Sequence, residues 1–239
     1  HNGAEVEIEC DFIAGCDGFH GICRPAIPAG ALTMYDHPYP MAWLGVLVEA
    51  PPMHHELVYT ASAAGFALFT MRSPTVSRLY LQCPVDDVVE NWSDDRIWSE
   101  FEKRLAGGAD RRLSIGPITQ KIITEMRSFV CEPMQYGNLF LAGDAAHIVP
   151  PTGARGLNTA GSDIHYLYHA MEAHYQRGDR SGLDSYSQKA LARAWKAQRF
   201  SWWLTSMLHT FPEAIEYDQR LQDTDLAYLF SSEAAMRSL

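Results

Sequence analysis

GDAAHIVPPTGARGLN, residues 143–158, follows a short apolar run at 139–142. This pattern predicts a strand that ends in a Gly-Asp pair, a turn, and a helix entered through Gly153 and Gly156. The first turn of a helix has unpaired N–H groups and carries the positive end of the helix dipole. The segment therefore predicts a seat for a negatively charged ligand, with Asp144 able to accept hydrogen bonds from sugar hydroxyls.

The composition is that of an ordinary globular protein. Of 239 residues, 47% are hydrophobic and 20% are charged, which is enough for one large domain or two small ones. A net charge of −10 argues against nucleic acid or an anionic membrane as the main partner. No apolar run approaches the roughly 20 residues that a membrane span needs.

The cysteines indicate a reducing compartment. Their number is odd and no CxxC pair occurs, so we expect free thiols and a cytoplasmic protein. Because a free cysteine behaves as a small hydrophobic residue, we expect each of them to be buried. The five are Cys10, Cys16, Cys23, Cys83 and Cys131.

Hydrophobic periodicity predicts strands first and helices later along the chain. The expected strands are 5–14, 42–49, 56–60, 66–71, 77–83, 122–130 and 138–142, the last in a parallel sheet. The run at 66–71 is apolar on both faces, which indicates a covered inner strand. A helix capped by Ser93 or Asp94 is expected to reach about residue 106, where Gly107-Gly108 ends it, and the chain is mostly helical from 156.

A second motif, GCDGFHG at 15–21, stands near the start. Together with GDAAHIVPPTGARGLN it resembles the two flavin-contact motifs of the flavin-dependent aromatic hydroxylases. The resemblance runs through most of the chain. It includes WLG at 43–45, HELVY at 55–59, GFALFTMRS at 65–73, SRLY at 77–80, RSFVCEPMQYG at 127–137 and RFSWWLTSMLH at 199–209.

One departure from the family is large. Its members open with a strand, a GxGxxG turn and a helix that hold the flavin pyrophosphate, and no GxGxxG occurs here. We therefore expect a fragment of a larger flavoenzyme that also lacks the family's C-terminal tail.

The implied fold is α/β (α+β): an incomplete FAD-binding Rossmann-like domain, an inserted antiparallel-sheet substrate domain and a helical C-terminal part. The expected division is 1–24 and 137–160 for the FAD-binding domain, 25–136 for the substrate domain and 161–239 for the helical region.

The resemblance also assigns substrate contacts. Arg72 matches the arginine that binds the substrate carboxylate, next to the hydroxyls of Thr70 and Tyr80. Even spacing puts Thr70 and Arg72 on one face of a strand, and an arginine fork suits a carboxylate. Spacing alone equally allows a surface ion pair for Arg72. Tyr59 matches the tyrosine that hydrogen-bonds the phenolic oxygen, which activates the ring position beside that oxygen.

Flavin and nucleotide contacts follow from the same comparison. Pro151 matches a residue whose carbonyl faces the substrate, and Arg78 matches an arginine beside the flavin ring, with a cross-strand ion pair as its alternative. His20 and Arg127 match positions associated with NADPH or NADH. The expected FAD contacts are Asp17, Asp144, Thr152, Gly153, Gly156, Leu157 and Asn158.

The resemblance implies hydroxylation of 4-hydroxybenzoate to 3,4-dihydroxybenzoate with FAD, NADPH or NADH, and O₂, by a homodimer. The alternatives are the same chemistry on another hydroxybenzoate or phenolic acid, and a catalytically inactive fragment. His54-His55 has no ligand-like spacing with other residues, so no metal site is expected.

Overall fold

The computed structural model describes residues 6–106 and 112–238, which form two compact units. Unit 1 contains His1–His37 and Arg127–Trp202, and unit 2 contains Pro38–Met126 and Trp203–Leu239. Three long elements contribute residues to both units: β2 (Thr33–Val48), β6 (Ile118–Glu132) and α4 (Tyr186–Leu208).

Unit 1 contains a three-stranded sheet in the order β1 (Ile13–Gly15), β8 (Leu139–Leu141) and β7 (Gln135–Tyr136). β1 and β8 are parallel, which confirms the parallel strand expected at 138–142. The adjacent β7 is antiparallel to β8. Phe140 and Leu141 of β8 are completely buried, and the strand delivers the chain to the Gly-Asp turn.

The expected strand at 5–14 is largely wrong. Only Ile13 and Ala14 of that range lie in β1, and the chain from Val6 to Phe12 has no regular structure. Val6 and Ile8 are 67% and 78% exposed. Alternating residues form a strand only when a neighbour takes up their backbone hydrogen bonds, and β1 pairs only from Ile13 onward. Residue 5 lies outside the described part.

The rest of unit 1 is short turns followed by helices. Tyr186 at the start of α4 donates its hydroxyl to the Leu141 carbonyl, 2.7 Å away, and so ties the helix layer to β8. The elements are η2 (Gly143–Ala145), β9 (His147–Ile148), η3 (Pro151–Gly153), α2 (Gly156–Arg177), α3 (Ser181–Asp184) and the first part of α4.

The second sheet has the strand order β3-β4-β5-β2-β6-β9. Its unit 2 part is an antiparallel meander of β3 (Val58–Ser62), β4 (Gly65–Ser73) and β5 (Val76–Cys83), with β5 next to β2. Phe66 to Phe69 are buried on both faces of β4, which confirms the covered inner strand. The bounds of β3, β4, β5 and β8 differ from the predicted ones by at most two residues at either end, whereas β2 and β6 are much longer than predicted.

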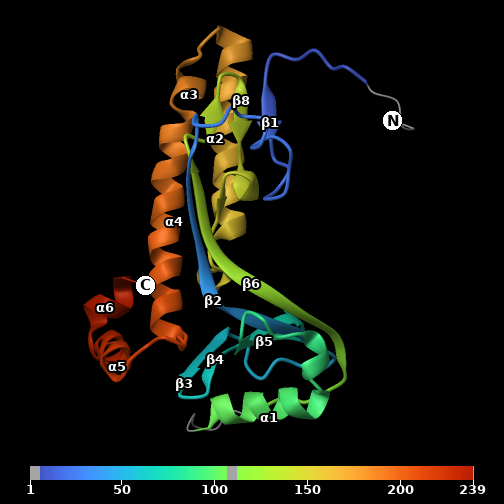
Figure 1. The fold of residues 1–239 in the computed structure, drawn as a ribbon, viewed down its shortest axis with the longest axis vertical. Coiled ribbons are helices and arrows are strands. Elements are labelled where there is room, and N and C mark those ends of the chain that lie inside the picture. Colours follow the sequence, from blue (N-terminus) through green and yellow to red (C-terminus); the bar gives the residue numbers. More distant parts are fainter. Residues whose placement is uncertain (1–5, 107–111, 239) are drawn as a thin grey trace. The chain divides into compact units, whose positions relative to one another are not determined.

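One face of the meander packs on helix α1 (Asp94–Leu105), as Figure 1 shows. Ser93 caps this helix: its Oγ accepts the Arg96 N–H at 3.2 Å, which confirms the predicted start. Ile97 and Phe101 are completely buried against Ala67, Phe69 and Leu81 of the sheet. Gly107-Gly108, the expected end of this helix, lies outside the described residues.

Unit 2 is completed by the end of α4 and by three short elements. They are η1 (Val89–Asn91), α5 (Glu216–Ser231) and α6 (Glu233–Ser238). The helical content beyond residue 156 confirms the prediction for that region. Within the described ranges, no helix has both the length and the apolar character that crossing a membrane requires.

All five cysteines are free, as expected, but their burial divides them. Cys83 and Cys131 are buried, and burial raises the pKa of each thiol to about 11. Cys23 is half-buried, and Cys10 and Cys16 are exposed, so the expectation of a buried side chain is wrong for the last two. Cys10 lies in the irregular segment before β1, and Cys16 directly follows that strand.

Candidate functional site

The Gly-Asp turn of unit 1 is held by a buried carboxylate. Gly143 has φ of +60°, a conformation that favours glycine, and its N–H donates to Asp163 Oδ2 at 3.0 Å. The same oxygen lies 2.6 Å from His147 Nε2. Both side chains are completely buried. This clamp fixes the turn so that the next residue, Asp144, is exposed at the end of β8.

The start of α2 supplies unpaired donors. Its N-cap, Arg155, makes no side-chain capping bond, and Gly156, Leu157 and Asn158 form the first turn with Leu157 86% exposed. The N–H groups of such a turn have no partner within the helix. Ala154, just before it, has φ of +48°, an unusual value for a residue with a Cβ atom. These donors and the dipole suit an electron-rich or anionic edge of a planar cofactor.

The residues just before this helix are shaped by close packing. A Cβ atom on Gly153 would lie 2.5 Å from Ser201 Oγ of α4, so the turn can approach the helix only with glycine here. Thr152 is completely buried, whereas Pro151 is exposed. Thr152 therefore supports the turn from inside, and only backbone groups near Pro151 can face a ligand.

The Asp-Gly motif forms a second loop in unit 1. The carboxylate of Asp17 accepts the Cys23 N–H at 2.9 Å, and this bond lowers the pKa of the acid. A Cβ atom on Gly21 would lie 2.1 Å from Asp17 Cγ, so the loop closes only because that residue is glycine. The exposed carboxylate thus organises its own loop as well as being available to a cofactor.

An arginine that the sequence analysis did not identify joins the two motifs. Arg24 donates to the carbonyl of Ala145 at 2.8 Å and to the carbonyl of Phe19 at 2.6 Å. It therefore links the Asp-Gly loop to the Gly-Asp turn within unit 1. No motif spacing marks this residue, because its partners are backbone carbonyls that sequence patterns do not specify.

The two residues assigned to the pyridine nucleotide lie together. The guanidinium of Arg127 lies 4.8 Å from the Phe19 ring centroid, and the His20 ring lies edge-on to the same ring at 5.1 Å. Arg127 Nε is also 3.6 Å from Asp36 Oδ1. The Arg24 guanidinium lies 4.7 Å from the same Phe19 ring centroid. The structure thus gathers two cations and one imidazole around an aromatic ring, a combination suited to a phosphate-bearing ligand.

Three of the residues that the sequence analysis assigned to the substrate, Tyr59, Thr70 and Tyr80, lie in cross-strand rows on the face of the meander opposite α1. Tyr59 pairs with Leu68, which pairs with Tyr80, which pairs with Gly45. Directly opposed residues point to the same side of a sheet, so both tyrosines project from this face. A Cβ atom on Gly45 would lie 3.1 Å from Tyr80 Cε1, so the absent side chain leaves room for that ring.

Thr70 and Arg78 form the next row of the same face. The Thr70 hydroxyl donates to the Arg78 carbonyl at 2.8 Å, so its hydrogen is already used inside the sheet. The Arg78 guanidinium lies 5.3 Å from the Tyr80 ring centroid, a cation–π contact in place of the ion pair that was its alternative.

Arg72 is exposed and lies where the β4–β5 register shifts between Met71 and Ser73. A bulge breaks strict alternation and redirects a side chain. Even spacing from Thr70 is therefore not what sets the direction of Arg72.

Burial raises the pKa of Tyr59 above its usual value, so its hydroxyl stays protonated near neutral pH. Its ring lies 5.9 Å from that of Phe66, and the Trp43 ring lies 5.1 Å from that of Tyr80. Trp43 and Phe66 were not among the predicted site residues. Both lie within matched strings, WLG at 43–45 and GFALFTMRS at 65–73, but only strand pairing shows that they share a face with the tyrosines.

The one group of possible metal ligands among the described residues is His54, His55 and Glu56, whose ligand atoms lie within 4.8 Å of one another. They are consecutive in a loop, and His54 Nδ1 accepts the Glu56 N–H at 3.1 Å. A nitrogen that accepts a hydrogen bond offers no lone pair to a metal through that atom. This group carries no metal assignment.

Comparison with known proteins defines the class. A family model described as an FAD binding domain matches residues 1–201, and the chain belongs to this family. It is 52% identical over 238 residues to p-hydroxybenzoate hydroxylase of Acinetobacter baylyi, across 100% of the chain and 59% of that protein. It is 24% identical over 202 residues to kynurenine 3-monooxygenase of Emericella nidulans, across 79% of the chain and 39% of that protein.

Solved structures of aromatic hydroxylases share the fold. p-Nitrophenol 4-monooxygenase from Pseudomonas putida superposes with a TM-score of 0.72 at 18% identity, covering 95% of this chain and 57% of its own. Aklavinone-11 hydroxylase, solved with FAD and aklavinone, superposes with a TM-score of 0.67 at 21% identity, covering 83% of this chain and 38% of its own. At these identities the likeness concerns the fold. The chain spans between about two fifths and three fifths of the length of these relatives.

Proposed function

We propose that this chain is part of a flavin-dependent monooxygenase that hydroxylates 4-hydroxybenzoate to 3,4-dihydroxybenzoate, using FAD, NADPH or NADH, and O₂. The observation that carries the proposal is the row Tyr59–Leu68–Tyr80 on the face of the unit 2 meander opposite α1. It belongs to a chain that is 52% identical to p-hydroxybenzoate hydroxylase along its whole length.

In unit 2 we assign the two ends of the aromatic acid to different groups. The exposed Arg72 binds the carboxylate through two parallel charge-assisted hydrogen bonds. We assign Tyr80 and Thr70 to the same carboxylate, although Thr70 can donate to the acid only if it releases the Arg78 carbonyl. The Tyr59 hydroxyl, kept protonated by its raised pKa, donates to the phenolic oxygen and stabilises the phenolate form.

A stabilised phenolate is electron-rich at the carbon next to its oxygen. That carbon is the position which becomes hydroxylated in 3,4-dihydroxybenzoate. Tyr59 therefore acts on the reacting group itself, and Arg72 orients it.

In unit 1 we assign FAD to the residues that the Gly-Asp and Asp-Gly motifs present. Asp144 accepts from the sugar-alcohol hydroxyls, and the N–H groups of Gly156, Leu157 and Asn158 face the pyrimidine edge of the flavin. Asp17, Thr152 and Gly153 shape the turns around them, and the Pro151 carbonyl completes the contacts of unit 1. Arg78, which belongs to unit 2, is assigned to the flavin ring from the family resemblance alone. When bound, FAD would supply the redox chemistry that activates O₂.

His20 and Arg127, gathered on Phe19, are assigned to the pyridine nucleotide. Five free thiols support a cytoplasmic location, and the family resemblance supports a homodimer. Sedimentation of the purified protein tests the dimer.

The test of the function is the visible spectrum of the purified protein after addition of FAD, with and without 4-hydroxybenzoate. We expect a bound flavin band that shifts when the acid is added. A protein that takes up no FAD would favour the alternative that this chain by itself is a catalytically inactive fragment. Uptake of FAD with a shift only for 3-hydroxybenzoate would move the substrate to another hydroxybenzoate.

A further inference from the structure

His209 follows the end of helix α4, and its side chain is completely buried in unit 2. Its Nδ1 lies 3.0 Å from the Thr205 carbonyl, and its Nε2 lies 2.8 Å from Trp43 Nε1. A carbonyl only accepts and an indole N–H only donates, so Nδ1 carries the hydrogen and Nε2 is the acceptor. Both ring nitrogens are therefore used, in one defined tautomer.

The imidazole is also part of a stack of three rings. It lies 4.2 Å from the Phe66 ring at an interplanar angle of 26°, and 5.7 Å from the Trp43 ring at 15°. Trp43 and Phe66 in turn lie 5.1 Å apart at 15°. The hydrogen bond to His209 thus fixes the position of the Trp43 ring, and the nearly parallel rings of His209 and Phe66 fix its orientation.

This stack supports the face that carries the substrate residues. The Trp43 ring lies 5.1 Å from Tyr80, and the Phe66 ring lies 5.9 Å from Tyr59. Each tyrosine ring therefore rests on a different member of the stack, so a displaced Trp43 or Phe66 would change the direction of a tyrosine hydroxyl.

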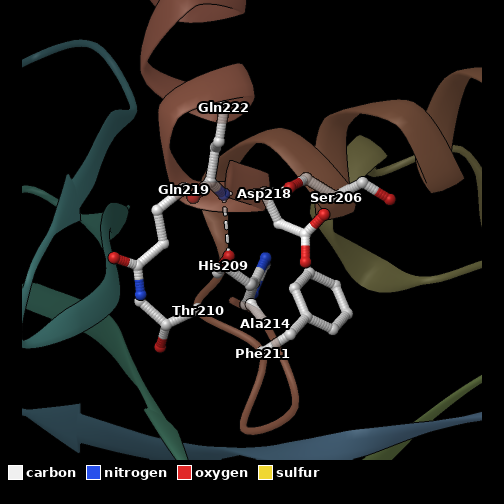
Figure 2. A pocket seen from close by; sticks show the side chains of 8 residues that line it. All are labelled: Ser206, His209, Thr210, Phe211, Ala214, Asp218, Gln219 and Gln222. Carbon is white, nitrogen blue, oxygen red and sulfur yellow. Dashed lines mark hydrogen bonds between the residues drawn. The ribbon is translucent and has the colours of Figure 1, made fainter. Parts of the chain in front are cut away.

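The backbone around His209 is held from two sides. Gln222 of α5 donates to the His209 carbonyl at 2.8 Å and to the Ser206 carbonyl at 2.9 Å, as Figure 2 shows for His209. Gln82 Oε1 accepts the N–H of Thr210 at 3.1 Å and that of Phe66 at 3.2 Å. The turn after α4 is thereby connected both to α5 and to strands β4 and β5.

We propose that His209 is a positioning residue for the substrate face. By accepting the indole N–H, it sets the place of Trp43 in the ring stack, and the stack sets the directions of Tyr59 and Tyr80. The inference rests on the proposed function for its effect on catalysis, but its structural part concerns only residues of unit 2.

Two variants separate the bonds of the imidazole. The amide of glutamine reaches the place of Nε2, so His209→Gln keeps an acceptor for Trp43. The amide of asparagine reaches only the place of Nδ1. His209→Asn therefore keeps a donor to the Thr205 carbonyl but has no acceptor for the Trp43 indole N–H. Both substituted side chains are neutral and polar. The control is Gln219→Ala: Gln219 is exposed and, like His209, lines a small cavity of about 80 Å³ (Figure 2).

The first measurement is the ¹H–¹⁵N resonance of the Trp43 indole, together with the ring resonances of Tyr59 and Tyr80. We expect His209→Gln and Gln219→Ala to resemble the parent protein. In His209→Asn the indole resonance should shift and exchange faster, and both tyrosines should shift. Equal spectra for the Gln and Asn variants would overturn the proposal.

The second measurement is 4-hydroxybenzoate affinity and the fraction of NADPH oxidation that yields product. His209→Asn should weaken affinity about fivefold and halve that fraction, and Trp43→Phe should remove the difference between the Asn and Gln variants. An undiminished difference in the Trp43→Phe background would overturn the route through Trp43. A parent protein that binds no hydroxybenzoate would refute the proposed function, while the resonances still decide whether His209 positions the three rings.

Discussion

Asp163 Oδ2 accepts the Gly143 N–H at 3.0 Å and lies 2.6 Å from His147 Nε2, with both side chains completely shielded from solvent. The acid comes from helix α2 and the histidine from β9, so one oxygen joins the helix to the turn that presents Asp144. A buried carboxylate that loses a partner is costly, which makes this contact a structural requirement of the Gly-Asp motif.

Asp163→Asn tests this clamp. The amide oxygen can take the place of Oδ2, but the substitution removes the charge that strengthens both contacts and puts an NH₂ group at the place of Oδ1, a buried atom with no hydrogen-bond partner. We expect the free energy of unfolding to fall by about 3 kcal/mol, measured in urea at pH 7. Asp179→Asn, at an exposed acid, should change it little. A stable Asp163→Asn protein would show that the turn does not depend on the carboxylate.

Arg72→Ala should weaken 4-hydroxybenzoate binding by about 10- to 100-fold, since hydrogen bonds to charged groups contribute about 1.5–3 kcal/mol. Titration of the spectral change measures the affinity. Arg96→Ala is the matched control, because this arginine lies over the Trp92 ring in the same unit. Equal affinities for the parent protein and Arg72→Ala would refute the carboxylate assignment.

Tyr59→Phe should mainly suppress hydroxylation. The phenylalanine keeps the ring contact with Phe66 but cannot stabilise the phenolate, so the yield of 3,4-dihydroxybenzoate per NADPH oxidised should fall about tenfold or more. Chromatographic quantification of product against NADPH consumed provides the ratio. Tyr217→Phe, at a residue that is 66% exposed, should leave the ratio unchanged. A normal yield from Tyr59→Phe would contradict the assigned role.

Gly45→Ala should displace Tyr80, because the added Cβ atom would lie 3.1 Å from its ring. Overpacking of this kind destabilises by about 1–3 kcal/mol. A Cβ atom on Gly161 in α2 would meet no atom within 4 Å. Gly161→Ala should therefore raise the free energy of unfolding by up to about 1 kcal/mol, since alanine favours the helix. Thermal unfolding of the two variants distinguishes them, and similar shifts in the same direction would argue against a steric role for Gly45.

The buried His209 makes stability depend on pH. Burial lowers its pKa in the folded protein to about 4 from 6.5. Its neutral form therefore stabilises the fold fully above pH 6.5, and this contribution is lost as the pH falls from 6.5 towards 4, because the unfolded chain binds the proton more readily. At 1.36 kcal/mol for each pH unit, the loss approaches about 3 kcal/mol.

Urea unfolding of the parent protein and of His209→Gln, at pH 7.5 and pH 4.5, isolates this contribution from that of the carboxylates. The parent should lose about 2–3 kcal/mol more than the variant over this interval. The same loss in both proteins would mean that the imidazole is not buried in its neutral form.

Much of the fold follows from local patterns in the sequence. Ser93 and the stripe of Ile97 and Phe101 identify α1, and the doubly apolar run at 66–71 identifies the inner strand β4. Periodicity fails at 5–14, where the residues alternate but β1 pairs only from Ile13 onward. It also cannot show the bulge at Arg72, because a bulge depends on the register of two strands.

The sequence by itself determined the class of protein. Two motifs and six matched strings identify a flavin-binding family, because the glycines and acids of the motifs specify the turns at which a cofactor can approach the backbone. The tertiary structure alone decided which side chains act together. Asp163 reaches Gly143 from twenty residues away, and His209 reaches Trp43 from 166 residues away. Burial and strand register create these contacts, and the local spacing of residues in the sequence determines neither of them.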